Sequence, residues 1–407
     1  MIADICLVAC AKTKRKKQGR AEDIYVSPLF DKYRQFAREH CRTWYILSAK
    51  YGLLQPDRTV EPYDETLKSM SEAQRKQWAA SVFQDLRSRS RTSDRITILA
   101  GNFYRKHLMS LLSQEGYETH VPLEGKSIGV QLRWLNTVNH NPDRLDHLER
   151  FYHLLARLEQ GLGGKRVLRE CTGHMDWPKR GVYFLFEPEE MRTLKKSEPR
   201  VVRVGTHMVS RRSKATLWNR LRTHRGTYKG GGNHRGSIFR LHVGAAMLMR
   251  NHNEYCLPTW ESGSTAPASV RESETKMEQK VSAYIGRTSV LWLRVPDEPG
   301  PKSDRAYIER NCISLLAGPW GPIDLPSRGW LGNHCPNQRV VRSGLWNADF
   351  TEYHYDSRFL DILEEYVDVT LDNRPDPQAS IAPTHWYLTD TRQVSPYQEL
   401  LFGEAFE

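Results

Sequence analysis

The stretch LWNRLRTHRGTYKGGGNHR, residues 217–235, concentrates side chains that can hold or cut an anionic molecule. It carries four arginines, two histidines and a lysine, interrupted by a run of glycines. Arg220 and His224 stand four residues apart, so a helix places them on one face. A guanidinium fork suits phosphate oxygens and an imidazole can carry a proton, and cutting a phosphodiester requires both functions. The stretch therefore predicts a partner with phosphate groups, which is either bound or cleaved.

Two tripeptides before this stretch lie at hairpin spacing. GVY stands at 181–183, and RVG follows about twenty residues later at 203–205, on the expected partner strand. In this order, and followed by the basic helix, they resemble the GIY-YIG nuclease family over roughly residues 175–350. The resemblance departs at the second tyrosine of the family signature, where Arg203 stands. His224 is then expected to take over part of that tyrosine's role.

Two later stretches extend the resemblance. DRAYIERNCISLLAG (304–318) resembles the acidic helix of the family, in which Glu309 would hold the metal ion. SRGWLGNH and VRSGLWNADF resemble the closing segments of restriction-enzyme members, and they would place Asn347 near the site. The resemblance implies an α+β nuclease domain, a Mg²⁺ or Mn²⁺ cofactor, and double-stranded DNA as the partner.

The same residue types fit the chemistry of phosphodiester hydrolysis. The reaction needs an activated water, stabilisation of charge on the phosphoryl oxygens, and help for the leaving oxygen. Glu309 can hold one Mg²⁺ and Arg220 can bind the phosphate. Either Tyr183 or His224 can take the proton from water. Taken singly, these side chains also suit a packed strand, a nucleic-acid-coating helix or an exposed carboxylate, but their joint order favours a one-metal hydrolase without a covalent intermediate.

Further basic residues around the helix are predicted to hold the nucleic acid. The glycines are expected to let the backbone approach the phosphates closely. The sequence does not separate backbone contact from base reading, and charge alone leaves RNA as an alternative substrate. The predicted nucleic-acid-binding residues are Arg203, Arg222, Arg225, His234, Arg235 and Arg240.

In the N-terminal half, polar side chains gather just past the ends of predicted strands. Ligands bind at the carboxyl ends of strands in open α/β sheets, so we expect these side chains to line one pocket. The predicted pocket residues are Ser48, Lys50, Tyr51, Tyr63 and Asn102, together with Asp64, and with Lys12 and Lys14 after the first strand.

The segments SAKYGL, PYD and PLEGKSIGVQLRWL resemble an uncharacterised family of small bacterial and phage α/β domains over about residues 3–140. That family is distantly similar to uracil-DNA-glycosylase-like and deazaguanine-related proteins. The resemblance implies a pocket that binds or excises a nucleobase, with Asp64 as the catalytic carboxylate of excision. A flipped base would stack on Tyr51 or Tyr63 and hydrogen-bond to Asn102. The alternative for PYD is a turn with a capping aspartate.

Composition limits the class of protein. The 407 residues allow two or three domains, and 60 basic against 48 acidic side chains give a net charge of +12, which fits a polyanionic partner. No stretch approaches the roughly 20 apolar residues that span a bilayer. The N-terminal apolar run is typical of a strand and not of a signal peptide, and the seven cysteines contain no CxxC pair. We therefore expect a cytoplasmic protein with reduced thiols.

The order of elements predicts two domains of different type. Residues 1–142 alternate short apolar strands with amphipathic helices, which predicts a parallel-sheet α/β domain. Residues 143–168 are predicted as a helical linker that ends in a glycine pair. Residues 169–407 combine short strands, glycine-rich loops and basic helices, and within them 256–276 is predicted as a mobile loop.

These features together predict a Mg²⁺-dependent DNA endonuclease joined to a base-sensing or base-excising domain, in which excision would make the chain a DNA glycosylase as well. Modification-dependent restriction in antiviral defence is the setting that suits this pairing. One alternative is an ordinary site-specific restriction endonuclease, and another is a nucleic-acid-binding protein with a decayed nuclease fold. The sequence leaves open whether the protein is a monomer or a dimer.

Overall fold

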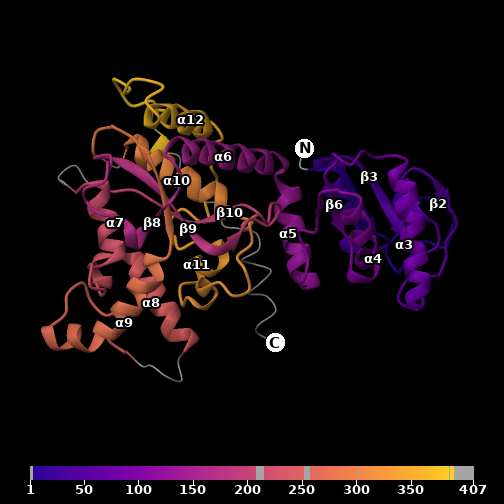
Figure 1. Cartoon of the computed structure of the whole chain (residues 1–407), viewed down its shortest axis with the longest axis horizontal. Helices are drawn as coiled ribbons and strands as arrows, with labels where there is room; N and C mark the ends of the chain where they lie inside the picture. The colour runs from indigo at the N-terminus through magenta and orange to yellow at the C-terminus, as the bar shows by residue number, and fades with distance from the viewer. Residues whose placement is uncertain (1–2, 208–214, 252–256, 301, 385, 389–407) are drawn as a thin grey trace. The chain divides into compact units, whose positions relative to one another are not determined.

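The computed structural model describes residues 3–207, 215–251, 257–300, 302–384 and 386–388 (Figure 1). The chain divides into two compact units, Met1–Asp146 with Thr193–Lys195, and His147–Arg192 with Lys196–Glu407. The predicted combination of a parallel-sheet α/β domain and an α+β domain is confirmed. Helix α6 (Pro142–Gly161) makes up most of the segment 143–168 that the sequence predicts as a helical linker, and it begins in the first unit and ends in the second.

The first unit is built on a five-stranded sheet with the order β4-β3-β1-β6-β7. Four strands run parallel, and β4 pairs antiparallel with β3 at one edge. The parallel strands come from short apolar runs that lack alternation, as expected for strands covered on both faces. The strands are β1 (Ala3–Ala9), β3 (Cys41–Ser48), β4 (Gly52–Leu54), β6 (Ile96–Leu99) and β7 (Thr119–His120).

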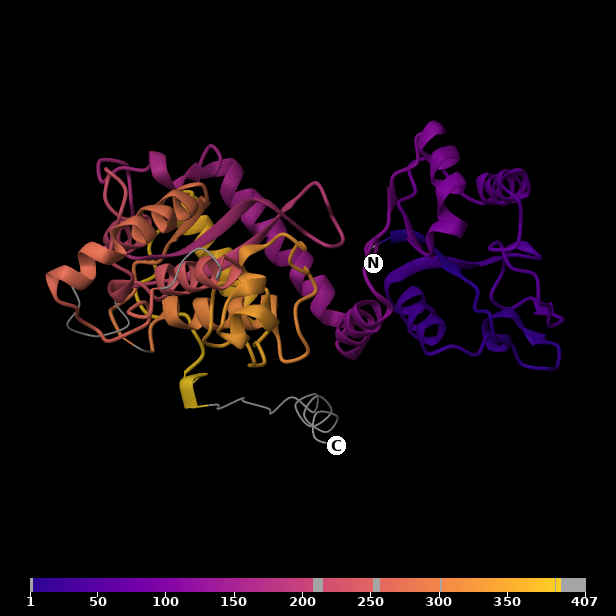
Figure 2. The same ribbon diagram turned by 90° about the horizontal axis from the view of Figure 1, so that it is seen from below.

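Helices cover both faces of this sheet, α2 and α5 on one side and α3 and α4 on the other (Figure 2). Ser27 caps α2 by accepting a hydrogen bond from the Phe30 amide, and Ser71 starts α3 with a capping box. A short antiparallel ladder of β2 (Gly19–Arg20) and β5 (Thr59–Val60), with helix α1 (Ala21–Ile24), adjoins the sheet. The covering helices are α2 (Pro28–His40), α3 (Glu72–Arg87), α4 (Asn102–Gln114) and α5 (Ile128–His140).

Strand order in the first unit creates a switch point beside β1. The chain passes from β1 to β3 on one side, and later returns to β6 on the other side of β1. In open α/β sheets, ligands commonly bind at the carboxyl ends of the strands beside such a point. Ser48 ends β3, Lys50 and Tyr51 follow it, and Asn102 follows β6.

The second unit contains a four-stranded sheet with the order β10-β9-β11-β8, all antiparallel. The predicted hairpin is confirmed as the β9–β10 pair, and β11 pairs with the other side of β9. Tyr183 and Leu185 join a core on one face of the sheet, whereas Phe184 contacts Phe151 of α6 on the other face. The strands are β8 (Arg166–Val167), β9 (Gly181–Met191), β10 (Pro199–Gly205) and β11 (Ser289–Arg294).

Helices also cover both faces of the second sheet (Figure 1). One face carries α7 (Leu217–Arg225), α8 (Ile238–Arg250) and α9 (Ala268–Gly286). The other carries α6, α10 (Asp304–Ala317) and α12 (Phe359–Thr370), and the short α11 (Gln338–Ser343) follows a 3₁₀ turn. The prediction of a mobile loop over 256–276 is wrong from Ala268 onward, because α9 begins there and buries Met277 and Val281.

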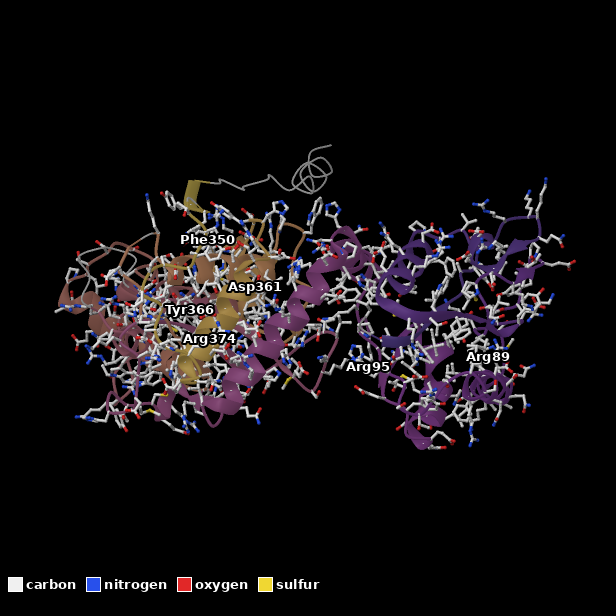
Figure 3. The ribbon with its side chains drawn as sticks, turned by 90° about the horizontal axis from the view of Figure 1, so that it is seen from above. Arg89, Arg95, Phe350, Asp361, Tyr366 and Arg374 are labelled. Carbon is white, nitrogen blue, oxygen red and sulfur yellow. The ribbon has the colours of Figure 1, made fainter. Side chains whose placement is uncertain are left out.

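Helix α12 lies along α6, as Figure 3 shows around the labelled Asp361. Arg150 of α6 pairs with Asp361 and Glu364 at 2.7 Å, and Arg157 pairs with Asp368 at 2.9 Å. These pairs attach α12 to the outer side of the second unit. Within the described residues, no helix is long and apolar enough to cross a membrane.

Candidate active site

Strand β9 and helix α7 bring Tyr183 and His224 together beneath the surface of the second unit. The Tyr183 hydroxyl lies 2.7 Å from His224 Nε2, and both side chains are fully buried. Burial first, and then the charges of Arg220, Arg203 and Arg240, lower the pKa of His224 well below its usual value. His224 is therefore neutral, and its Nε2 forms a hydrogen bond with the Tyr183 hydroxyl.

The other ring nitrogen of His224 is fixed by Ser237, the N-cap of α8. Nδ1 lies 2.7 Å from Ser237 Oγ, which also accepts the amide of Arg240 at 3.2 Å. Both ring nitrogens of His224 thus have a hydrogen-bond partner, which fixes the orientation of the ring. Ser237 was not predicted from the sequence, where it shows only as a serine before a helical run.

Arg203 lies against Tyr183 inside the unit. Its Nε donates to the Tyr183 hydroxyl at 3.4 Å, and another guanidinium nitrogen donates to the Trp346 carbonyl at 2.7 Å. Its side chain is also 5.0 Å from the centre of the Phe239 ring. The prediction that Arg203 contacts nucleic acid is therefore corrected, because only 4% of it is exposed and its donors serve the site from within.

Gly205 of the second tripeptide is required by Tyr183. A Cβ at this position would lie 2.2 Å from the Tyr183 hydroxyl oxygen. The hydroxyl therefore occupies the space that a side chain on β10 would take. This contact explains why a glycine closes the tripeptide RVG.

Glu309 and Arg220 form the outer layer of the site, where both are only partly buried. Glu309 Oε1 accepts the Thr206 amide at 3.1 Å. Burial raises the pKa of Glu309 to about 7, although Arg203, the Thr206 amide and Arg220 each lower it. Arg220 Nε has no hydrogen-bond partner within the described residues, and the charge of Arg220 is close enough to Glu309 to lower the pKa of that carboxyl.

Asn347 holds β10 in place. Its Nδ2 donates to the Val204 carbonyl at 2.8 Å and its Oδ1 accepts the Val204 amide at 3.1 Å. The Trp346 amide donates to the Val202 carbonyl at 2.8 Å, so residues 346–347 run beside β10 like a further strand. The sequence predicts Asn347 as a catalytic residue, and its contacts suit a positioning residue, because both ends of its amide bind the backbone just before Gly205.

Glu309 is the carboxylate that fits a divalent cation. Among the described residues, no group of three or more His, Cys, Asp or Glu side chains could hold a metal ion. Mg²⁺ does not need such a group, since it is commonly held by one or two carboxylates, waters and substrate phosphates. Burial favours the neutral form of Glu309. A cation bound beside it would favour the charged form and so lower its pKa again.

Three of the predicted nucleic-acid-binding residues are buried in ion pairs with α9. Arg240 Nε donates to Glu278 at 2.9 Å, and His234 Nδ1 lies 2.9 Å from the same carboxylate. Arg235 makes a two-pronged contact with Glu274 at 2.6 and 2.9 Å. The predicted role of His234, Arg235 and Arg240 in nucleic-acid contact is therefore corrected, because these side chains attach the segment after α7 to α9.

Arg225 is buried as well, and of the predicted set only Arg222 is exposed. Arg225 donates to the Cys171 carbonyl, so its predicted contact with nucleic acid is also corrected. The expectation that glycines admit phosphates to the backbone fails at two positions. A Cβ on Gly232 would lie 2.4 Å from the Arg240 guanidinium carbon, and one on Gly226 would lie 2.1 Å from the Gly231 carbonyl oxygen.

In the first unit, β3 ends in a hydrogen-bonded cluster. Ser48 Oγ lies 2.7 Å from the Tyr63 hydroxyl, which lies 2.9 Å from the Tyr25 hydroxyl. The Tyr51 amide donates to Ser48 Oγ at 3.0 Å, and Lys14 Nζ is 4.0 Å from the centre of the Tyr63 ring. The structure thus brings together four of the predicted pocket residues, Ser48, Tyr51, Tyr63 and Lys14.

The switch point adds side chains that sequence reasoning missed. Cys10 Sγ, just after β1, lies 3.2 Å from the Tyr104 hydroxyl of α4. Trp78 packs edge-on against Tyr104 and donates to the Ser48 carbonyl at 2.9 Å. No sequence signal points to these residues, because α3 and α4 bring them from distant parts of the chain.

The other predicted pocket residues lie at the surface. Lys50 is 5.4 Å from the centre of the Tyr51 ring and 3.8 Å from Glu65. Asp64 is exposed, and so is Asn102, the first residue of α4. Neither belongs to the buried cluster of hydroxyl groups.

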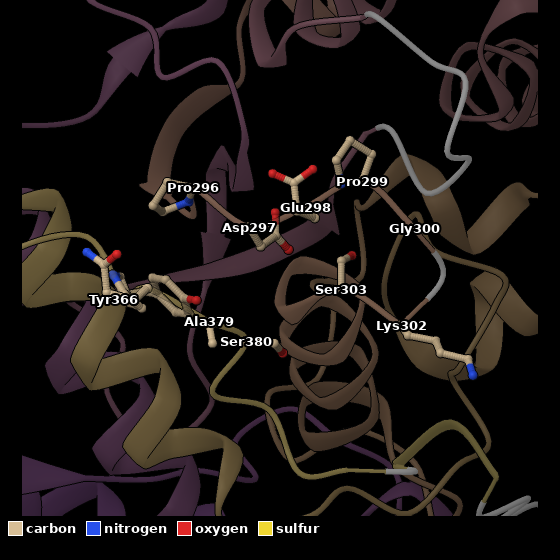
Figure 4. Close-up of a pocket in the computed structure, with 12 residues that line it drawn as sticks. Pro296, Asp297, Glu298, Pro299, Gly300, Lys302, Ser303, Tyr366, Ala379 and Ser380 are labelled. Atoms are coloured by element: carbon tan, nitrogen blue, oxygen red, sulfur yellow. The ribbon is translucent and has the colours of Figure 1, made fainter.

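A separate cavity of about 530 Å³ lies at the N-terminal end of α10 (Figure 4). Its lining includes Asp297, Ser303, Tyr366 and Ser380. Its walls contain none of the predicted site residues, and Glu309 lies more than one helical turn further along α10.

The second unit is an α+β domain, and the comparison with known protein families places it in a class. Residues 142–373 match the family described as "GIY-YIG domain", which is more than half of the chain. The chain therefore belongs to the GIY-YIG family, and it is a nuclease whose substrate is DNA.

The first unit matches a family without a known activity. Residues 5–137 match the description "Family of unknown function (DUF6884)". An uncharacterized protein of Bacillus subtilis (strain 168), YfjM, is 29% identical over 145 residues, which cover 32% of this chain and 92% of that protein. No solved structure matches the chain. The likeness to uracil-DNA-glycosylase and deazaguanine-related proteins stays a prediction.

Proposed function

We propose that this chain is a Mg²⁺-dependent DNA endonuclease in which Tyr183 and His224 act as one proton-accepting pair. The observation that carries the proposal is the 2.7 Å contact between the Tyr183 hydroxyl and Nε2 of a buried, neutral His224. His224 acts through Tyr183 in this proposal, because its Nε2 is in contact with the Tyr183 hydroxyl and its Nδ1 with Ser237. The two candidates for the proton acceptor thereby become successive members of one path.

Proton transfer follows from this arrangement. As Tyr183 Oη takes a proton from the attacking water, its own proton passes to His224 Nε2. The imidazolium that forms donates from Nε2 to Tyr183 and from Nδ1 to Ser237, so both of its N–H groups are satisfied. Tyr183 is fully buried, so substrate binding at the outer layer has to open a path to its hydroxyl.

The outer layer binds the phosphate. Arg220, with an unpaired Nε, offers donors to the phosphoryl oxygens, and its charge balances the charge that develops there. When bound at Glu309, Mg²⁺ would polarise a phosphoryl oxygen and lower the pKa of a bound water. Arg203 donates a hydrogen bond to the Tyr183 hydroxyl and holds it in place.

A cleavage assay on plasmid DNA tests this proposal. The wild-type chain is incubated with Mg²⁺ or with EDTA, beside Arg220→Ala and the exposed-arginine control Arg222→Ala. Cutting that needs Mg²⁺ and disappears with Arg220→Ala supports the assignment. If the wild-type chain cuts DNA neither with Mg²⁺ nor with EDTA, the result favours the alternative of a DNA-binding protein with a decayed nuclease fold.

We further propose that the first unit binds a nucleobase and directs the nuclease to base-modified phage DNA. Support comes from the cluster around Ser48 and Tyr63, which sits at the carboxyl ends of strands beside a switch point. Such a role suits modification-dependent restriction in antiviral defence. Excision of the base would depend on a carboxylate, for which Asp64 is the predicted residue.

Plain plasmid and base-modified phage DNA, incubated side by side and then run with and without alkali, test the role of the first unit. Cutting of the modified DNA alone supports base sensing. Cutting of both substrates favours an ordinary site-specific endonuclease. Alkali-labile sites that persist in Glu309→Ala but vanish in Asp64→Ala support excision, and their absence in every substrate contradicts it.

A further inference from the structure

A column of stacked groups runs from the second sheet to the surface. Trp292 of β11 contacts Trp177 at 4.6 Å between ring centres, and Trp177 stacks on Trp218 of α7 at 5.4 Å with 20° between the planes. The Arg225 guanidinium lies 5.1 Å from the centre of the Trp218 ring and 5.4 Å from that of Tyr228. Tyr228 is therefore the outermost group of a supported aromatic column.

Exposure rises sharply at the outer end of this column. Arg225 is 8% exposed and Trp292 is also 8% exposed, whereas Tyr228 is 80% exposed. One face of the Tyr228 ring is supported from below by a buried guanidinium, and the rest faces solvent. Large exposed aromatic side chains on a fixed support are typical of binding surfaces.

The turn that carries Tyr228 is fixed by its own contacts. The Thr227 amide donates to the Gly231 carbonyl at 2.9 Å, and the Ser282 hydroxyl of α9 donates to the same carbonyl at 2.8 Å. Gly226 has φ of 88°, a conformation that glycine alone adopts without strain. The ring is therefore held outward before any ligand arrives, which reduces the entropic cost of binding.

The surroundings of Tyr228 favour a nucleic acid as the ligand. Residues 217–235 contain no acidic side chain, and Arg222 and Lys229 of this segment are exposed. These cations suit phosphate groups. Phosphate binding alone does not require the exposed aromatic ring of Tyr228 beside them. A base within a duplex presents only its edges, whereas an unstacked base presents a face that can stack on an aromatic ring.

We propose that Tyr228 is a stacking platform for an unpaired nucleobase of the DNA substrate, next to the catalytic helix α7. The proposal rests on the proposed DNA endonuclease function. It specifies in addition that the second unit binds a base that is unpaired. Arg222 and Lys229 bind the flanking backbone. The ring selects DNA in which a base has left the stack, whether at an end, in a bulge or by flipping.

Fluorescence anisotropy in EDTA tests the platform without cleavage. The full chain is titrated into a labelled blunt duplex and into the same duplex with one unpaired base. The variants are Tyr228→Ala, the conservative Tyr228→Phe, and Phe103→Ala, which removes a 45% exposed aromatic ring from the other unit. Cleavage with Mg²⁺ is measured separately, so failure of the endonuclease function is seen independently of base binding.

The expected result is that Tyr228→Ala weakens binding to the duplex with the unpaired base by about tenfold. Tyr228→Phe and Phe103→Ala should leave that affinity unchanged, and the blunt duplex should show no effect of any variant. Equal weakening for both duplexes, or no change with either, would overturn the platform. No change with either DNA would also be the result if the ring bound a protein surface.

Discussion

Replacing Glu309 by Gln is expected to abolish cleavage while making the second unit more stable above neutral pH. Burial raises the pKa of Glu309 from its ordinary value of 4.5 to about 7, so the folded chain holds its proton more tightly than the unfolded chain does. The unfolding free energy contributed by this group is therefore highest below pH 4.5. It falls as pH rises towards 7 and stays low above that value.

The size of the effect follows from the displaced pKa. A change from 4.5 to about 7 corresponds to at most about 3 kcal/mol between the two protonation states. Because Glu309 is partly exposed, screening by solvent reduces the expected gain of Glu309→Gln at pH 8 to about 1–2 kcal/mol. At pH 5 the gain should be much smaller, because most of the wild-type carboxyl is then protonated.

Urea unfolding at pH 5 and pH 8 in EDTA measures this difference. Glu298→Gln is the matched control, because its side chain is 92% exposed in the same unit. Mg²⁺ should raise the unfolding midpoint of the wild type at pH 8 and leave Glu309→Gln unchanged, since a ligand stabilises the state that binds it. A variant less stable than the wild type at pH 8 would refute the reasoning, and so would one that still cleaves DNA at the wild-type rate.

Other substitutions separate catalysis from stability. Tyr183→Phe should lower the cleavage rate about 10²–10⁴-fold in single-turnover assays, while DNA affinity in EDTA stays constant. Gly205→Ala should lower it at least as much, because the new methyl would meet the Tyr183 hydroxyl at 2.2 Å; normal cleavage would show that this contact is absent. Arg240→Met removes the guanidinium partner of the buried Glu278 carboxylate, which keeps only its contacts with His234, and should cost about 3–5 kcal/mol in urea unfolding. Arg222→Ala should leave stability within about 0.5 kcal/mol and lower the salt dependence of DNA binding, and the reverse pattern for these two arginines would contradict their placement.

The sequence located the catalytic hairpin and helices because their signals are local. Short apolar runs predicted β1, β3 and β6, and the four-residue spacing of Arg220 and His224 predicted their shared helix face. The order of these segments then placed Tyr183 and Glu309 in one predicted site. In the structure Arg203 connects the two, since it donates to the Tyr183 hydroxyl and its charge lowers the pKa of Glu309.

Burial of the basic residues could not be read from the sequence. Glu274 and Glu278 stand some 40 residues after Arg235 and Arg240, in a helix whose buried face carries carboxylates. Apolar residues at helical spacing appear only from Met277 onward, and the first turns of α9 contain a single large apolar residue, Val270, so the sequence did not mark the start of this helix. The density of basic residues in the sequence therefore predicted a nucleic-acid-binding surface at positions where the structure has internal ion pairs, those of Arg235 and Arg240 with α9.

Tyr183 and His224 are proposed to take one proton from the attacking water along a single path. The most direct test is the pH dependence of single-turnover DNA cleavage with Mg²⁺, measured for wild type, Tyr183→Phe, His224→Ala and the double variant. The account predicts that both single variants lose nearly as much rate as the double variant, because the two residues act as a unit. Additive losses in the double variant, or cleavage by Tyr183→Phe at the wild-type rate, would contradict it.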